Sequence, residues 1–246
     1  MIRIALPATF FLLNSTALAR VASNASLPVF GNGPNGGITL STPMQIAIFM
    51  TLMALLPAAV MSITPFLRIS IVLHFLRQAL GTQTAPSNQV LVGLSLFLSI
   101  LIMQPVVTDM YRKGWQPMES GQLSMEQAFD EGSKPLKTFL IRFAREKDIR
   151  TFLEISRSEQ PRTPADLELQ ILVPAYILSE LKAGFQIGAV LFLPFLIIDL
   201  VVASVTLSIG MVQLPPAMIS APFKILLFVL VDGWSLVIGS LMKSFF

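Results

Sequence analysis

Four long apolar runs and one polar block make up most of this chain. Each run is close to the ~20 residues that an α-helix needs to cross the hydrocarbon core of a bilayer. We therefore expect an all-α membrane protein, in which two apolar helical hairpins, residues 44–111 and 185–246, flank the polar block. The four runs that predict these helices cover residues 44–66, 90–111, 185–209 and 223–242.

The polar block, residues 112–184, is typical of a small helical domain. It holds 22 of the 31 charged residues of the chain, 11 basic and 11 acidic, so its formal charge is zero. Ser124 and Gln127 have the spacing of a capping box, and residues 163–166 place a proline in the first turn of another helix. No β-hairpin signal appears anywhere in the chain. Ser133 can cap a further helix with one apolar stripe, namely Leu136, Phe139, Leu140 and Phe143.

The start of the chain predicts a secretory signal. A short apolar core follows Arg3, and an A-x-A cleavage site ends at Ala19. We expect cleavage after Ala19, which removes residues 1–19; an uncleaved first anchor is the alternative. Residues 20–43 are rich in Gly, Asn, Ser and Pro, which predicts a flexible exported segment.

The link between the first two apolar runs indicates the orientation of the chain. Arg68, His74 and Arg77 lie in this link without an acidic residue. Basic links favour the cytoplasmic side of a membrane, and a signal peptide places the mature start of the chain on the other side. The polar block is then expected on the outer side.

Composition excludes several classes of function. The chain has no cysteine, so disulfides and thiolate metal sites are excluded, and its single histidine makes no metal site alone. The net charge of +3 is spread out, and no basic cluster with interleaved aromatics indicates a nucleic acid partner. No G-x-x-x-x-G-K loop is present to bind a nucleotide. We expect no enzyme activity, metal or cofactor.

Three charges lie inside the last two apolar runs, where each needs a partner or an aqueous cavity. Asp199 and Lys224 lie at similar distances from a tight connector, which predicts a buried ion pair within the chain or between copies. A proton or ion relay is the alternative. Asp232 is a further intramembrane charge. Two aspartates in membrane-length segments are also a feature of intramembrane aspartic proteases. Nothing in the sequence brings their carboxyls together, as that chemistry requires.

Met211 lies in the connector directly after Gly210. Methionine is flexible and fills irregular gaps, so a ring of such side chains can close a pore and still yield to a passing chain. Filler in an apolar turn is the alternative interpretation.

Three long motifs resemble the FliP family of flagellar export-gate proteins. They are residues 174–185, 193–199 and 222–234, which read PAYILSELKAGF, LPFLIID and PFKILLFVLVDGW. The resemblance covers essentially all of the chain after residue 19. It implies a pore-forming core subunit of the flagellar type III export gate in the bacterial inner membrane. Implied partners are further copies in a pentamer, FliQ-like and FliR-like subunits, other export-gate components and unfolded flagellar substrates.

The same resemblance implies where the pore narrows. In the family the constriction is a methionine-rich loop between the last two helices, which here reads Met211, Val212, Gln213. Only Met211 keeps the residue type, and Gln213 departs from a purely apolar seal. Two alternatives stay open: the equivalent subunit of a virulence type III system, although the signal peptide favours the flagellar branch, and a proton-coupled small-molecule transporter.

Overall fold

The computed structural model describes residues 30–32, 38–82, 84–158, 161, 163–210 and 215–246. The chain divides into two compact units, Met1–Ala58 and Ala59–Phe246. The described residues are overwhelmingly helical, and the apolar helices among them define an α-helical membrane protein, as the sequence predicts.

The first unit contains a short antiparallel ribbon. Strand β1 (Phe30–Asn32) pairs with strand β2 (Ile38–Leu40), with Phe30 opposite Leu40. The expectation that the chain lacks a β-hairpin is therefore wrong here. Strands of three residues are too short to produce an alternating pattern that a sequence reading can detect. Helix α2 (Thr42–Ser62) follows, and none of its residues is buried.

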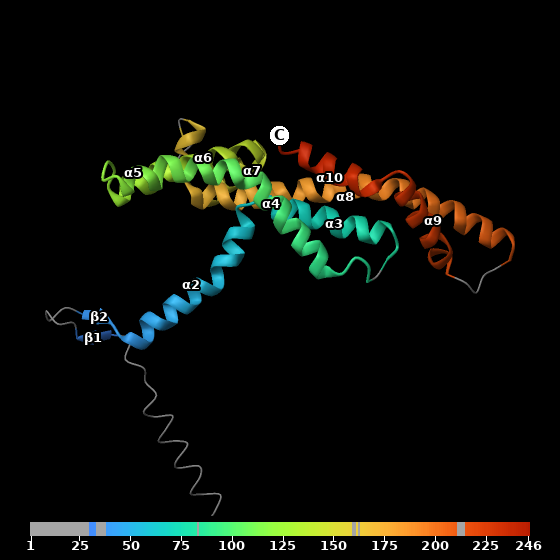
Figure 1. Ribbon diagram of the computed structural model, residues 1–246, viewed down its shortest axis with the longest axis horizontal. Helices are drawn as coiled ribbons and strands as arrows, with labels where there is room; N and C mark the ends of the chain where they lie inside the picture. The colour runs from blue at the N-terminus through green and yellow to red at the C-terminus, as the bar shows by residue number, and fades with distance from the viewer. Residues whose placement is uncertain (1–29, 33–37, 83, 159–160, 162, 211–214) are drawn as a thin grey trace, which may run out of the picture. The chain divides into compact units, whose positions relative to one another are not determined.

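The second unit is a set of helices joined by short connections (Figure 1). Its π-helix η1 and its 3₁₀ turn η2 are single turns between α-helices. The elements are α3 (Phe66–Ala79), α4 (Asn88–Met110), η1 (Tyr111–Trp115), α5 (Gln116–Glu119), α6 (Met125–Phe143), α7 (Glu146–Ser156), η2 (Pro164–Asp166), α8 (Leu169–Ser208), α9 (Pro216–Leu230) and α10 (Gly233–Lys243).

Side-chain caps start two of these elements where the sequence predicts them. Ser124 Oγ accepts from the Gln127 N–H at 3.3 Å and Gln127 Oε1 accepts from the Ser124 N–H at 3.0 Å, so the capping box is confirmed. Thr163 and Asp166 form a second box, but it opens only the turn η2. The separate helix predicted at Ser133 is wrong, because α6 runs on through Ser133 and Pro135. Ala128 before that point and Phe139 after it are both buried on the same helix, and one missing backbone N–H does not end the helix.

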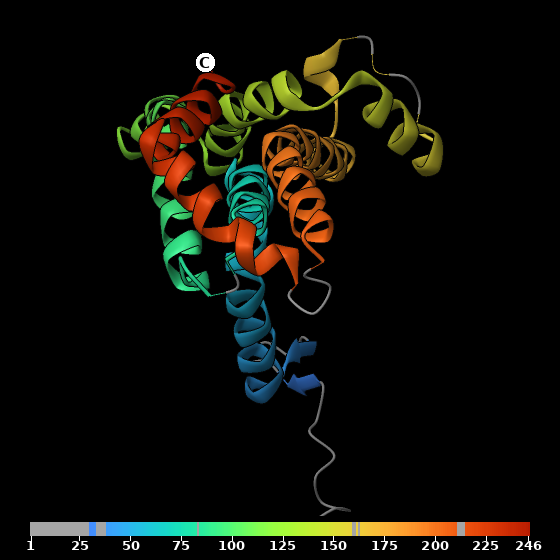
Figure 2. The same cartoon turned by 90° about the vertical axis from the view of Figure 1, so that its right-hand side faces the viewer.

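The core of the second unit forms around α3, which lies between α4 and α8 (Figure 2). Ile69, Val72 and Leu76 of α3 are fully buried. Gly188 lets α8 approach closely, because a Cβ there would lie 2.6 Å from the ring of Phe75. Burial of this apolar face is the main stabilising term for the helix packing.

Apolar length identifies the candidate membrane spans. Within the described residues, three helical stretches are long and apolar enough, namely Thr42–Ser62, Asn88–Glu119 and Leu169–Ser208. A fourth is the pair α9 and α10, which bends by 67° at the break between them. The single helix predicted over residues 223–242 is therefore wrong, because the chain breaks at Val231 and Asp232.

Two further boundaries differ from the hairpin description. Residues 44–111 contain three helices rather than two, because the chain turns at residues 63–65 and α3 starts anew after Pro65. Helix α8 runs without a break for 40 residues and passes through residue 184, where the polar block was expected to end. No proline or turn dipeptide lies between residues 175 and 193, so nothing in the sequence stops the helix at this point.

Candidate functional site

Helix α8 brings together three ion pairs with different neighbours. Glu180 faces α3, Lys182 faces α7 and Asp199 faces α9. Each pair joins residues that are far apart in the sequence, so each depends on the packing of two helices.

The innermost pair joins Arg68 of α3 to Glu180 of α8. The Arg68 Nε–H donates to Glu180 Oε2 at 2.9 Å, and the Nη2 group donates to the other carboxylate oxygen. The Arg68 residue is 6% exposed and Glu180 is fully buried. Such a two-pronged pair satisfies both groups, and removal of one partner leaves a buried charge, which costs about 3–5 kcal/mol.

Aromatic rings cover this pair on one side. The Arg68 guanidinium lies 4.1 Å from the ring centroid of Phe245 and 5.5 Å from that of Phe143. Its Nη1 group donates to Ser244 Oγ at 3.2 Å. The two rings contact each other with centroids 5.3 Å apart. One guanidinium therefore joins α3, α6, α8 and the residues that follow α10.

A second pair fastens α7 to α8. Asp148, which is 1% exposed, accepts from Lys182 Nζ on one oxygen and from Ser179 Oγ on the other at 2.8 Å. The Arg145 N–H donates to Ser179 Oγ at 2.9 Å. Burial raises the pKa of the Asp148 carboxyl, but the hydrogen bonds from Lys182 and Ser179 and the positive charges of Lys182 and Arg145 together outweigh burial, so the pKa is lowered.

The third pair consists of two residues that the sequence singles out. Lys224 Nζ lies 2.6 Å from Asp199 Oδ2, and Ser220 Oγ donates to Asp199 Oδ1 at 2.5 Å. The Lys224 side chain is 4% exposed and that of Asp199 is 31% exposed. The structure thus brings Asp199 and Lys224 together within one chain.

The other predicted site residues are placed differently. Asp232 is exposed at the break before α10, and no ion pair to it is found among the described residues. Asp199 lies with Lys224, and no contact between the two aspartates is found in the described part of the chain. Ala19 and the predicted constriction, Met211, Val212 and Gln213, lie outside the described residues.

Sequence reasoning missed the roles of Glu180 and Asp148 and treated Arg68 only as a basic link residue. Glu180 sits among apolar residues of the long motif at residues 174–185, which is a usable signal. Asp148 gives no such signal, because it lies among many other charges of the polar block.

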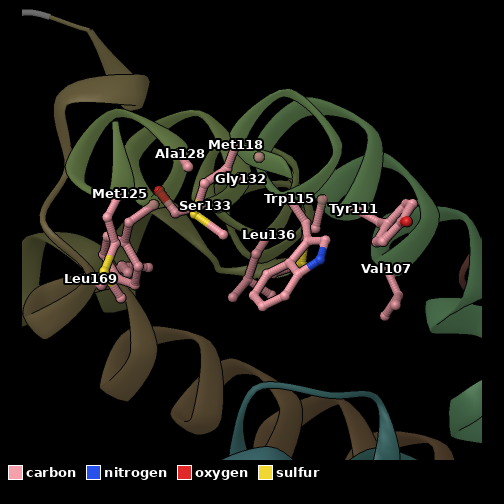
Figure 3. A pocket seen from close by; sticks show the side chains of 13 residues that line it. Val107, Tyr111, Trp115, Met118, Met125, Ala128, Gly132, Ser133, Leu136 and Leu169 are labelled. Carbon is pink, nitrogen blue, oxygen red and sulfur yellow. The ribbon is translucent and has the colours of Figure 1, made fainter. Parts of the chain in front are cut away.

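An apolar cavity of 490 Å³ lies beside η1, α5 and α6 (Figure 3). The rings of Tyr111 and Trp115 and the side chain of Leu136 line it. The two walls meet closely, because a Cβ on Gly114 would lie 2.8 Å from the Cα of Gly132. The lining is almost wholly apolar, so the cavity fits apolar side chains rather than a polar substrate.

No cluster of side chains that could hold a metal ion is found within the described residues. No group of three or more His, Asp or Glu side chains with metal-binding geometry occurs there. Each of the three ion pairs on α8 instead joins one acidic to one basic side chain, an arrangement that fixes helices to each other.

Fold and site together define a multi-pass α-helical membrane protein whose apolar helices are cross-linked by buried ion pairs. Comparison with known families makes the assignment specific. Residues 49–241 match the FliP family, and the chain belongs to that family.

Several characterised relatives are similar over most of their length. The flagellar biosynthetic protein FliP of Pectobacterium carotovorum subsp. carotovorum is 48% identical over 213 residues, which cover 87% of this chain and 83% of the relative. The protein of the same name from Bacillus subtilis is 44% identical over 84% of this chain and 93% of its own length. The one from Caulobacter vibrioides is 44% identical over 95% of this chain and 86% of its own.

Proposed function

We propose that this chain is a pore-forming core subunit of the flagellar type III export gate. As a component of the flagellar export apparatus, it conducts unfolded flagellar subunits across the bacterial inner membrane. The observation that carries the proposal is the family match over residues 49–241, which spans the apolar helices and their paired charges.

The surfaces of the helices support a role inside a larger assembly. Large apolar side chains on several faces of α8 and α9 are exposed in the single chain, among them Phe185, Ile197 and Phe223. Companion subunits can bury these faces, as the apolar cavity beside η1 can receive an apolar side chain. The partners are further copies in a pentamer, FliQ-like and FliR-like subunits and other gate components.

The pore constriction belongs to the connector between α8 and α9. Helix α8 ends at Ser208 and α9 begins at Pro216, and the Asp199–Lys224 pair ties these two helices together, which supports a role for the segment that joins them. We place the polar block, residues 112–184, on the periplasmic side, with the signal peptide removed after Ala19. In the same topology, the two apolar parts of the chain, residues 44–111 and 185–246, lie on either side of this block in the sequence.

The mass of the purified complex tests the proposal. The tagged chain is extracted in mild detergent from flagellated cells and the intact particle is weighed. We expect a particle that contains several copies and the companion subunits, far heavier than the 26.9 kDa chain. A deletion strain should lose filament secretion and regain it with the intact gene. A stable monomer that transports a small solute, or a deletion that blocks only virulence secretion, would contradict it.

A further inference from the structure

Helix α10 and the three residues after it form a separate arm, residues 233–246, which we call the strap. The arm starts at a sharp break, where α9 and α10 meet at 67° (Figure 1). Asp232 at this break has φ 51° and ψ 52°, a left-handed conformation that few non-glycine residues adopt. Such a break lets the orientation of α10 change at one or two residues without unwinding either helix.

The strap packs against the hydrophobic core of the second unit through one apolar stripe. Val237, Leu241 and Phe245 recur every four residues and are 8%, 3% and 2% exposed. They join the same hydrophobic core as Phe139 and Leu140 of α6. The stripe points its last member, Phe245, at the Arg68–Glu180 pair.

The surface that contacts the strap carries charged groups as well as apolar ones. Two nitrogens of the Arg68 guanidinium already bind Glu180. Its third nitrogen donates to Ser244, and one face of the guanidinium plane packs on the ring of Phe245. The Arg142 guanidinium on α6 also donates to the Phe246 carbonyl oxygen at 3.0 Å. Ser244 and Phe245 thus contact Arg68 of this pair, and Phe246 contacts Arg142 of α6.

We propose that the strap is a hinged element that closes over the Arg68–Glu180 pair, with the ring of Phe245 stacked on the guanidinium as its catch. A cation over an aromatic face gains attraction that an aliphatic side chain of similar size does not supply. The closed strap completes the junction of α3, α6 and α8. The open strap exposes its apolar stripe and leaves the α7–α8 contact in place, because that contact uses Asp148, Ser179 and Lys182 instead.

Cysteine cross-linking in isolated membranes measures closure directly, because the chain has no cysteine of its own. The pair Arg142→Cys with Phe246→Cys, treated with a flexible thiol-to-thiol cross-linker, reports the closed strap. The pair Arg145→Cys with Gln186→Cys reports the α7–α8 contact, since these exposed side chains lie within hydrogen-bond distance at 2.5 Å. Each pair is then combined with a change at Phe245 or Arg68.

We expect Phe245→Leu, which keeps apolar bulk but removes the ring, to reduce the 142–246 product by about fivefold or more. Arg68→Lys, which loses the fork that holds Glu180, should act in the same direction. The 145–186 product should be unchanged in both, and Lys243→Ala, an exposed change on the strap itself, should alter neither product. If Phe245→Leu leaves the 142–246 product intact, the ring is not the catch. If both products fall together, the strap is not a separately hinged element, and either result overturns the proposal.

Discussion

Lys224 and Asp199 are 25 residues apart in the sequence, yet Lys224 Nζ and Asp199 Oδ2 lie 2.6 Å apart in the structure. The pair joins α8 to α9 on either side of the connector that holds the predicted constriction. Ser220 satisfies the second carboxylate oxygen. Neither charge is therefore isolated in its apolar surroundings.

Removal of either partner should strongly weaken the α8–α9 hairpin. Asp199→Ala leaves Lys224 buried and unpaired, and Lys224→Ala leaves the carboxylate unpaired. We expect a loss of about 3 kcal/mol, the lower end for a buried pair because Asp199 is 31% exposed. The yield of intact complex from detergent extracts measures the effect, with Lys147→Ala as a control for loss of an exposed charge.

The exchange of Asp199→Lys with Lys224→Asp should recover part of that yield. Recovery would show that the two charges act on each other, since each reversed side chain alone faces a like charge. Normal complex formation by both alanine variants would rule out the pairing as a requirement for assembly.

Acid should release α7 from α8 through Asp148. The pKa of this carboxyl in the folded chain is lowered from its ordinary value of 3.8. Its ionised form therefore adds stability above the ordinary pKa, and this contribution is lost as the pH falls below 3.8 through the folded value. The difference in thermal stability between the wild-type chain and Asp148→Asn should be constant at neutral pH and shrink only in that acidic window. A difference that shrinks already between pH 8 and pH 6 would contradict the assignment.

Two glycines of the same candidate span should respond differently to a methyl group. A Cβ at Gly114 would lie 2.6 Å from the carbonyl oxygen of Ala128. This oxygen belongs to the helix backbone, which moves little to make room for a methyl group. Gly114→Ala should cost about 1–3 kcal/mol. At Gly93 no atom lies within 4 Å of the added group, so Gly93→Ala should be neutral or stabilise by up to ~1 kcal/mol. Thermal unfolding of the two variants in the same detergent is the measurement, and equal shifts would refute the close crossing.

Substitution of Met211 tests the proposed seal. Met211→Ala shortens a side chain that we place at the narrowest point of the pore, so ion leak through the assembled gate should rise while export of filament protein continues. Conductance of cells or of reconstituted gates measures the leak, and Met218→Ala, an exposed methionine in α9, serves as a matched control. Unchanged conductance in Met211→Ala would remove this residue from the seal.

The polar block illustrates how far local signals reach. The box at Ser124 appears in the structure because it involves residues three apart, and local geometry alone satisfies it. Ser133 has an equally plausible capping position, yet α6 passes through it, because the packing of one continuous apolar stripe outweighs a weak local stop. The break at Asp232 differs, because Asp232 and Gly233 form a turn-favouring dipeptide. The long apolar run on either side of it still predicts one continuous helix, so the sequence reading missed the break.

The sequence by itself determined that this is a helical membrane protein of the FliP family, because apolar runs of membrane length and long specific motifs are properties of the linear chain. It also selected Asp199 and Lys224 as partners, since a charge in an apolar run requires one. Only the tertiary structure decided that Arg68 meets Glu180 under the ring of Phe245. These residues come from three distant parts of the chain, and no local pattern records which helices pack together.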